Sequence, residues 1–175
     1  MKCVAIGGVP ATGKTTLMKN IIDILQPKKQ FKFGLLRGYM KDNISILGVY
    51  KHGDVFGGTD KLSMAVQKDY KMYVDKMIMD CIFEGDRLFT KNNLLELCTK
   101  YDTKIIILEN DKDTLKYRHQ QRGDNQSEIF IKGRTTKISN ILSDEGLKPY
   151  INIHKLNSYK ESTDLANKIV KYLNH

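Results

Sequence analysis

The chain has 175 residues, of which 41% are hydrophobic and 28% are charged, so we expect one soluble domain over residues 1–175. No apolar stretch approaches the roughly 20 residues that cross a bilayer, and the first residues do not resemble a signal peptide, which argues against a membrane partner and for a cytoplasmic location. The formal net charge of +9 favours phosphate-bearing partners, either ATP or a nucleic acid, unless it reflects only a lysine-rich composition.

Short apolar runs that predict strands alternate with amphipathic stretches that predict helices. In chain order we expect strands at 2–7, 31–38, 77–83, 104–108 and 151–156, and a further strand at 44–50. Helices are expected at 14–25, 62–76, 92–100, 113–121, 127–142 and 162–173. This alternation predicts an α/β fold, with a parallel five-stranded sheet, helices on both faces, and ligands at the carboxyl ends of the strands.

The three cysteines lie in or beside apolar runs and show no metal-ligand spacing: Cys3, Cys81 and Cys98. Small thiols in such runs are typical of reduced packing residues in an intracellular protein. We therefore expect them to pack in the core, in preference to a catalytic role.

A glycine-rich loop follows the first strand and precedes the first helix. Residues 8–15 fit the P-loop pattern G-x-x-x-x-G-K-[ST] without exception. Glycines there let successive backbone N–H groups surround phosphate oxygens, while Lys14 reaches the β- and γ-phosphates and the Thr15 hydroxyl binds Mg²⁺. The alternative is a chance glycine-rich turn. The expected ATP-binding residues are Gly8, Ala11, Thr12, Gly13, Lys14, Thr15 and Thr16.

Two acids close the strand that ends near residue 83. Glu84 and Asp86 are two residues apart, so in an extended chain both side chains point to one side. P-loop proteins place a carboxylate there to hold Mg²⁺ with the Thr hydroxyl, and the second acid can accept the acceptor proton. The sequence leaves open which acid does which, or whether both are solvated loop acids. Arg87 is a candidate clamp for an acceptor phosphate.

Arginines gather between the strands at 104–108 and 151–156. Arg118 and Arg122 are four residues apart and share one helix face, and Arg134 follows. Small kinases carry arginines there in a lid, expected here at about 118–137, which neutralises the transferring phosphoryl group. Residues 123–125 are the expected hinge. The alternative is an ordinary solvated helix with surface cations.

The segment 57–63 follows the second strand region, where small kinases bind the acceptor. Asp60 is a candidate for binding a base or activating a hydroxyl, although Thr59 or Asp60 could equally cap the next helix. Arg37 could line the same pocket, and the residues expected to bind the acceptor are Arg37, Thr59, Asp60, Arg87 and Arg134. Asn157 lies directly after the last strand, where small kinases contact adenine.

In the order of these motifs the sequence resembles small P-loop kinases of the nucleoside and nucleoside-monophosphate type. Residues 56–64 (FGGTDKLSM) and 83–87 (FEGDR) more specifically resemble bacteriophage kinases that phosphorylate 5-hydroxymethyluracil in DNA. Thymidylate kinases usually carry an aromatic residue after the Asp-Arg pair, and here Leu88 follows. The phage resemblance implies ATP and Mg²⁺, a DNA acceptor that becomes hypermodified, and a location in the host cytoplasm.

Two other functions remain open from the sequence. One is a kinase of a free nucleoside, a nucleoside monophosphate or another small metabolite. The other is a nucleotide-binding protein without catalysis, against which the paired acids at Glu84 and Asp86 argue. The oligomeric state is not determined by the sequence.

Overall fold

The computed structural model describes residues 1–51, 57–121 and 127–174, and within these ranges the strands form one seven-stranded sheet in the order β2-β3-β4-β5-β1-β6-β7. The five strands from β4 to β7 in this order are parallel, whereas β2 and β3 are antiparallel additions at one edge. The mostly parallel α/β fold is therefore confirmed, but the predicted strand number of five is wrong for the whole sheet. The strands are β1 (Lys2–Gly7), β2 (Lys29–Phe33), β3 (Leu36–Lys41), β4 (Ile44–Leu47), β5 (Asp80–Glu84), β6 (Asp102–Glu109) and β7 (Ile151–Lys155).

The single strand expected at 31–38 is instead a hairpin of β2 and β3. The chain reverses at Gly34, whose φ of 58° lies in the left-handed region, and Phe33 pairs with Leu36 across the two-residue turn. The side chain of Asp69 accepts a hydrogen bond of 2.7 Å from the Leu35 N–H and fastens this turn to α2 (Val66–Asp75). The hairpin extends the sheet beyond β4, away from the parallel centre.

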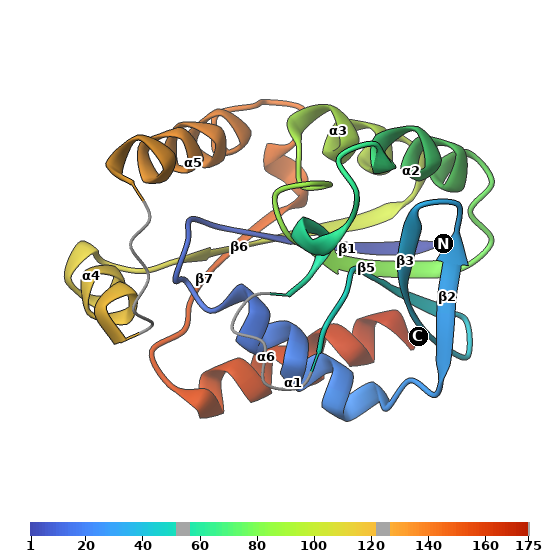
Figure 1. The fold of residues 1–175 in the computed structure, drawn as a ribbon, viewed down its shortest axis with the longest axis horizontal. Helices are drawn as coiled ribbons and strands as arrows, with labels where there is room; N and C mark the ends of the chain where they lie inside the picture. Colours follow the sequence, from blue (N-terminus) through green and yellow to red (C-terminus); the bar gives the residue numbers. More distant parts are fainter. Residues whose placement is uncertain (52–56, 122–126, 175) are drawn as a thin grey trace.

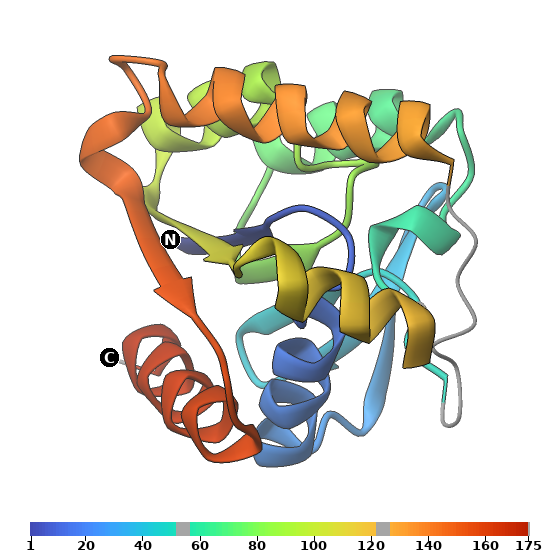
Figure 2. The same cartoon turned by 90° about the vertical axis from the view of Figure 1, so that its left-hand side faces the viewer.

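Helices cover both faces of the sheet (Figure 1). On one face lie α1 (Lys14–Leu25) and α6 (Tyr159–Leu173), and on the other lie α2, α3 (Lys91–Lys100) and α5 (Glu128–Leu142). The helix α4 (Lys112–Gln121), described throughout its length, buries none of its residues, and in the view of Figure 2 it lies between α5 above and α1 and α6 below. Two short 3₁₀ turns complete the fold, η1 (Thr59–Lys61) and η2 (Lys148–Tyr150).

The central strand β1 explains the two cores. Cys3 and Ala5 pack under α2, α3 and α5, while Val4 and Ile6 pack under α1 and α6. A strand buried on both faces has a continuous apolar sequence, which is why residues 2–7 were recognisable. In register, Ile6 pairs with Glu84, so the chain leaves β1 directly beside that carboxylate.

The three cysteines, all within the described ranges, are free and buried, as expected for packing residues. Cys3 and Cys81 are register partners on β1 and β5, with their sulfur atoms 3.5 Å apart. In the part of the chain that the structure describes, no helix combines the length and apolar character needed to span a bilayer.

Candidate active site

The loop between β1 and α1 is shaped by residues with positive φ angles. Gly8 has a φ of 142°, and a side chain there would place its Cβ 2.4 Å from the Leu108 carbonyl oxygen, so only glycine fits. Ala11, with a φ of 66°, is also in the left-handed region. Gly13 is the N-cap of α1, with a φ of 99°, and a helix N-terminus carries a partial positive charge that favours an anion. This backbone geometry suits an anion with several oxygen atoms.

The side chain of Lys14 lies over the same loop. Its ammonium group donates hydrogen bonds of 2.9 Å to the Gly8 carbonyl and 3.0 Å to the Val9 carbonyl. The buried hydroxyl of Thr12 donates to the Val9 carbonyl at 2.9 Å and stiffens the loop from within. A positive charge is therefore held at the place where the outer phosphates of a nucleotide would lie.

A hydroxyl and a carboxylate meet at the start of α1. The Thr15 hydroxyl donates a hydrogen bond of 3.0 Å to Glu84 Oε1, and Glu84 is only 2% exposed. Burial raises the pKa of Glu84 to about 7, although the charge of Lys14 and the hydrogen bond from Thr15 act to lower it. A buried carboxylate next to a hydroxyl has the donor set that P-loop proteins offer to Mg²⁺, so these residues fit the ion.

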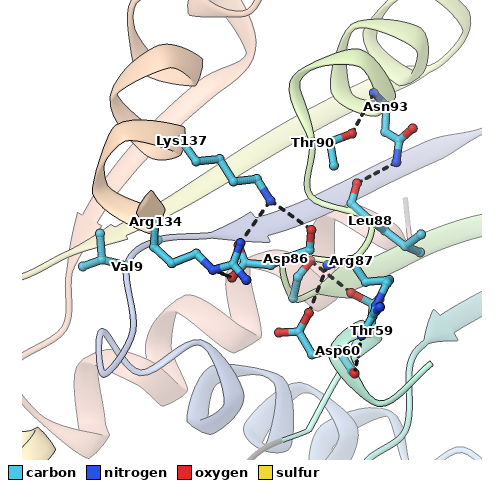
Figure 3. A network of polar contacts seen from close by, with 12 residues as sticks. Val9, Thr59, Asp60, Asp86, Arg87, Leu88, Thr90, Asn93, Arg134 and Lys137 are labelled. Carbon is cyan, nitrogen blue, oxygen red and sulfur yellow. Dashed lines mark hydrogen bonds and ion pairs between the residues drawn. The ribbon is translucent and has the colours of Figure 1, made fainter. Parts of the chain in front are cut away.

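Asp86 is held by cations from α5 (Figure 3). Arg134 Nε lies 2.7 Å from Asp86 Oδ2 in an ion pair without hydrogen-bond alignment. The Lys137 ammonium lies 3.3 Å from Asp86 Oδ1 and donates a hydrogen bond of 2.9 Å to the Asp86 carbonyl. The sequence grouped Asp86 with Thr15 and Glu84 as metal ligands, whereas the structure pairs its carboxylate with Arg134 and Lys137.

The end of β5 is tied to η1. Asp60 Oδ1 accepts a hydrogen bond of 3.0 Å from the Arg87 N–H, and the Arg87 guanidinium donates one of 3.2 Å to the Asp60 carbonyl (Figure 3). Thr59 is fully buried and donates to the Gly85 carbonyl at 3.0 Å. Thr59 was expected to face the acceptor, but its hydroxyl joins two loops instead.

These segments surround a cavity of about 430 Å³, the transfer cavity. Its lining comes from the P-loop, η1, the end of β5 and α5, which are far apart in the sequence. The lining residues are Pro10, Ala11, Gly13, Lys14, Thr15, Gly57, Asp60, Lys61, Glu84, Asp86, Arg87, Phe130 and Arg134. Acids and cations therefore converge beside the phosphate-binding loop, as a phosphoryl-transfer site requires.

Arg118 lies on the other side of the P-loop. Its guanidinium donates hydrogen bonds of 3.2 Å to the Ala11 carbonyl and 2.7 Å to the Leu156 carbonyl. It lines a second cavity, of about 300 Å³, together with Thr12, Gly13, Thr16, Asn157 and Ser158. The structure thus brings Arg118 and Asn157 together and separates both from Asp86.

One predicted arginine, Arg37, is not brought into these cavities, and another, Arg122, lies outside the described residues. Among the described residues, Arg37 is exposed on β3 and lines neither cavity. Arg122, the expected hinge at 123–125 and Phe56 of the phage-like motif lie outside the described residues. Of the lid expected over 118–137, the structure therefore describes the last residues of α4 and the first part of α5.

Four of the described residues that line the transfer cavity were not singled out from the sequence: Pro10, Gly57, Lys61 and Phe130. Phe130 precedes Arg134 by four residues, which places both on one helix face, and this spacing was an available signal. Lys61 directly follows Asp60 in η1 and carried no separate signal.

No protein-family model matches the chain, and no curated protein matches it. Among solved structures, an uncharacterized protein from Eubacterium ventriosum superposes with a TM-score of 0.54 at 12% identity, with 99% of each chain covered. A sugar kinase from Janibacter sp. gives a TM-score of 0.52 at 11% identity, covering 98% of this chain and 95% of that chain. Kti12 from Chaetomium thermophilum, solved in complex with ADP-AlF3, gives 0.50 at 8% identity over 98% of both chains. At such identities the likeness establishes only that this chain shares its fold with these proteins.

Proposed function

We propose that this protein is an ATP-dependent kinase that transfers the γ-phosphoryl group of ATP to a hydroxyl. The observation that carries the proposal is the 3.0 Å contact of Thr15 with the buried Glu84, at the wall of a cavity that also contains Lys14 and Asp86. P-loop proteins use a loop lysine, a hydroxyl and a carboxylate together when they transfer a phosphoryl group.

Each residue has a role in this reaction. The P-loop backbone and Lys14 bind the β- and γ-phosphates, and Thr15 with Glu84 would hold Mg²⁺, which supplies charge neutralisation when bound. The bond from the γ-phosphorus to the bridging oxygen of ADP breaks, and a bond to the acceptor oxygen forms. Asp86 orients the hydroxyl and accepts its proton, which then passes to solvent. The transition state is loose, so positioning by Asp86 contributes more than its basicity.

On the nucleotide side, Arg118 and Asn157 would contact the adenosine part of ATP. They share the second cavity with Thr16, on the face of the P-loop opposite Asp86. Arg118 hydrogen-bonds the Ala11 and Leu156 carbonyls, so it connects the phosphate loop to the segment after β7. We assign it to nucleotide binding and leave the transferring phosphoryl group to Lys14 and Arg134.

For the acceptor we propose the hydroxymethyl group of 5-hydroxymethyluracil in phage DNA. The support is the net charge of +9, the cationic lining of the transfer cavity by Lys61, Arg87 and Arg134, and the likeness of residues 83–87 to phage kinases. A base in a duplex would be flipped out to reach the cavity, at a cost of about a few kcal/mol. The cavity volume of about 430 Å³ also suits a free nucleoside, a nucleotide or another metabolite, which is the second candidate acceptor.

The test uses γ-labelled ATP, Mg²⁺ and a panel of acceptors: DNA containing 5-hydroxymethyluracil, unmodified DNA, free nucleosides, nucleoside monophosphates and sugars. We expect label in the modified DNA alone, with binding that weakens steeply with salt. Label in a small acceptor instead would retain the kinase and replace the DNA acceptor. Binding of ATP with no labelled product from any acceptor would contradict the kinase.

The same assay tests the role of Asp86. We expect Asp86→Asn to lower kcat by about a hundredfold while ATP still binds, because the hydroxyl loses its orienting carboxylate. The exposed Asp164→Asn on α6 is the matched control and removes the same charge far from the cavity. An Asp86→Asn enzyme with unchanged kcat would remove Asp86 from the mechanism.

A further inference from the structure

One wall of the transfer cavity is an aromatic ring. Phe130 lies in the first turn of α5, where the Ser127 hydroxyl accepts a hydrogen bond of 3.3 Å from its N–H. The residue is 40% exposed and lines the cavity together with Asp60 and Lys61 of η1. A lone exposed apolar side chain on an open surface needs no explanation. One that forms part of a polar cavity contacts whatever binds there.

The ring is held in place by the group that also holds Asp86. The Arg134 guanidinium carbon lies 4.6 Å from the centroid of the Phe130 ring, in cation–π contact. The same side chain makes the ion pair with Asp86 at 2.7 Å. Phe130 is thus fixed relative to Asp86, the carboxylate that orients the acceptor hydroxyl in the proposed function. A phenylalanine side chain has two rotatable bonds, so little freedom is lost when a ligand binds it.

We propose that Phe130 is a specificity-determining residue that stacks on the acceptor, so the acceptor is a planar, unsaturated ring that carries a hydroxyl-bearing substituent. This inference rests on the proposed function and narrows it, because a saturated sugar or cyclitol has no π face to offer. Stacking is tolerant of which base is bound, since every base has a π face. Phe130 therefore favours acceptors with a planar ring, and the surrounding polar residues would form hydrogen bonds with the edge of that ring.

The test measures binding separately from transfer. Wild-type protein is saturated with Mg²⁺ and a non-hydrolysable ATP analogue, and acceptors are titrated by calorimetry. The planar probes are 5-hydroxymethyl-2′-deoxyuridine and a single-stranded oligonucleotide that contains one 5-hydroxymethyluracil, and the saturated probe is ribose. The variants are Phe130→Leu, which keeps apolar volume without a ring, and Phe130→Tyr, which keeps the ring. Ile129→Leu is the matched control. Ile129 is 85% exposed and is not one of the described residues that line the cavity.

We expect a planar probe to bind the wild type more tightly than ribose, and Phe130→Leu to raise its Kd about tenfold. Phe130→Tyr should stay within about twofold of the wild type, and the Kd of the ATP analogue should be the same in all variants, which excludes misfolding. If Phe130 only positioned Arg134, Phe130→Leu would lower kcat and leave the acceptor Kd unchanged, and that result would overturn the inference. So would ribose binding in preference to the planar probes, or no binding by any planar probe.

Failure of the proposed function gives a different pattern. A planar probe that binds through Phe130 but receives no label would overturn the transfer reaction and retain the stacking site. A planar probe other than the modified base that binds and receives label would replace the DNA acceptor, and the Phe130→Leu effect on that probe would support the inference.

Discussion

The two sides of the site are built in different ways. The nucleotide side is made mainly by consecutive residues, the loop 8–15 and the first turn of α1, with Arg118 and Asn157 added from elsewhere. The acceptor side is assembled from η1, the end of β5 and α5, which only the folded chain brings together. The comparison shows that a site formed by one continuous segment can be recognised in the sequence, whereas a site formed by segments that only the fold brings together cannot.

The largest expected effect tests the continuous side. Lys14→Ala should lower kcat/KM by about a thousandfold, because it removes the charge that stabilises the phosphoryl oxygens in the transition state. Initial rates with labelled ATP measure it. Saturating Mg·ATP at about 100 times its Kd should also add about 2.7 kcal/mol to wild-type stability and less to the variant.

The control for this variant is Lys28→Ala, which removes an exposed lysine just after α1. It should leave kcat/KM and the nucleotide-induced stabilisation unchanged. Near-normal turnover by Lys14→Ala would show that the loop does not act as a P-loop and would remove the basis for calling one side the nucleotide side.

The fold was predictable where local pattern decided it. The helix at 14–25 was predicted with its observed bounds, since Leu17, Ile21 and Leu25 repeat at helical spacing and are buried. The hairpin was missed because the alternation of residues 31–38 continues through Gly34, and only the turn breaks it. The helix α6 begins at Tyr159, earlier than predicted, because Ser158 accepts a hydrogen bond from the Glu161 N–H in a capping arrangement that was overlooked.

The candidate site was predictable as a set of residues but not as a geometry. Glu84 and Asp86 were found from the strand that precedes them, yet their partners come from α1 and α5, which no local pattern relates to β5. Thr59 was expected at the acceptor because the segment 57–63 follows the second strand region, but its position against Gly85 depends on tertiary packing. Phe130 was missed although its spacing from Arg134 places both on one face of α5, because an apolar side chain does not by itself indicate a site.

A smaller effect tests the contact between the two sides. Burial raises the pKa of Glu84 from 4.5 to about 7, so between these pH values the folded protein retains a proton that the unfolded chain has released. The resulting contribution to the free energy of unfolding is fully present below pH 4.5 and is lost as the pH rises through about 7. The loss amounts to about 3 kcal/mol at most. Denaturant unfolding without nucleotide or Mg²⁺, from acid to about pH 8, measures it.

The variant that isolates this effect is Glu84→Gln, which cannot titrate. Its unfolding free energy should fall less with rising pH than that of the wild type over the same window. The control is Glu145→Gln, whose side chain is 83% exposed and whose pH profile should match the wild type. If the unfolding free energies of Glu84→Gln and the wild type depend on pH in the same way, Glu84 is solvated. The buried hydrogen bond between Thr15 and Glu84 would then not connect the two sides.

The smallest expected effect decides to which side Arg118 belongs. Sequence analysis placed Arg118 with the transferring phosphoryl group, whereas its hydrogen bonds to the Ala11 and Leu156 carbonyls place it with the nucleotide. Arg118→Met should weaken ATP binding about tenfold, because the loop at Ala11 and the segment at Leu156 then lose the side chain that holds them together beside the proposed nucleotide site, and kcat at saturating ATP should change little. Lys116→Met on the same helix removes the same charge outside the nucleotide cavity and should leave the Kd for ATP unchanged. If Arg118→Met binds ATP normally but has a lower kcat, Arg118 acts on the transferring phosphoryl group, as the sequence predicted. Arg118 would then not belong to the nucleotide side.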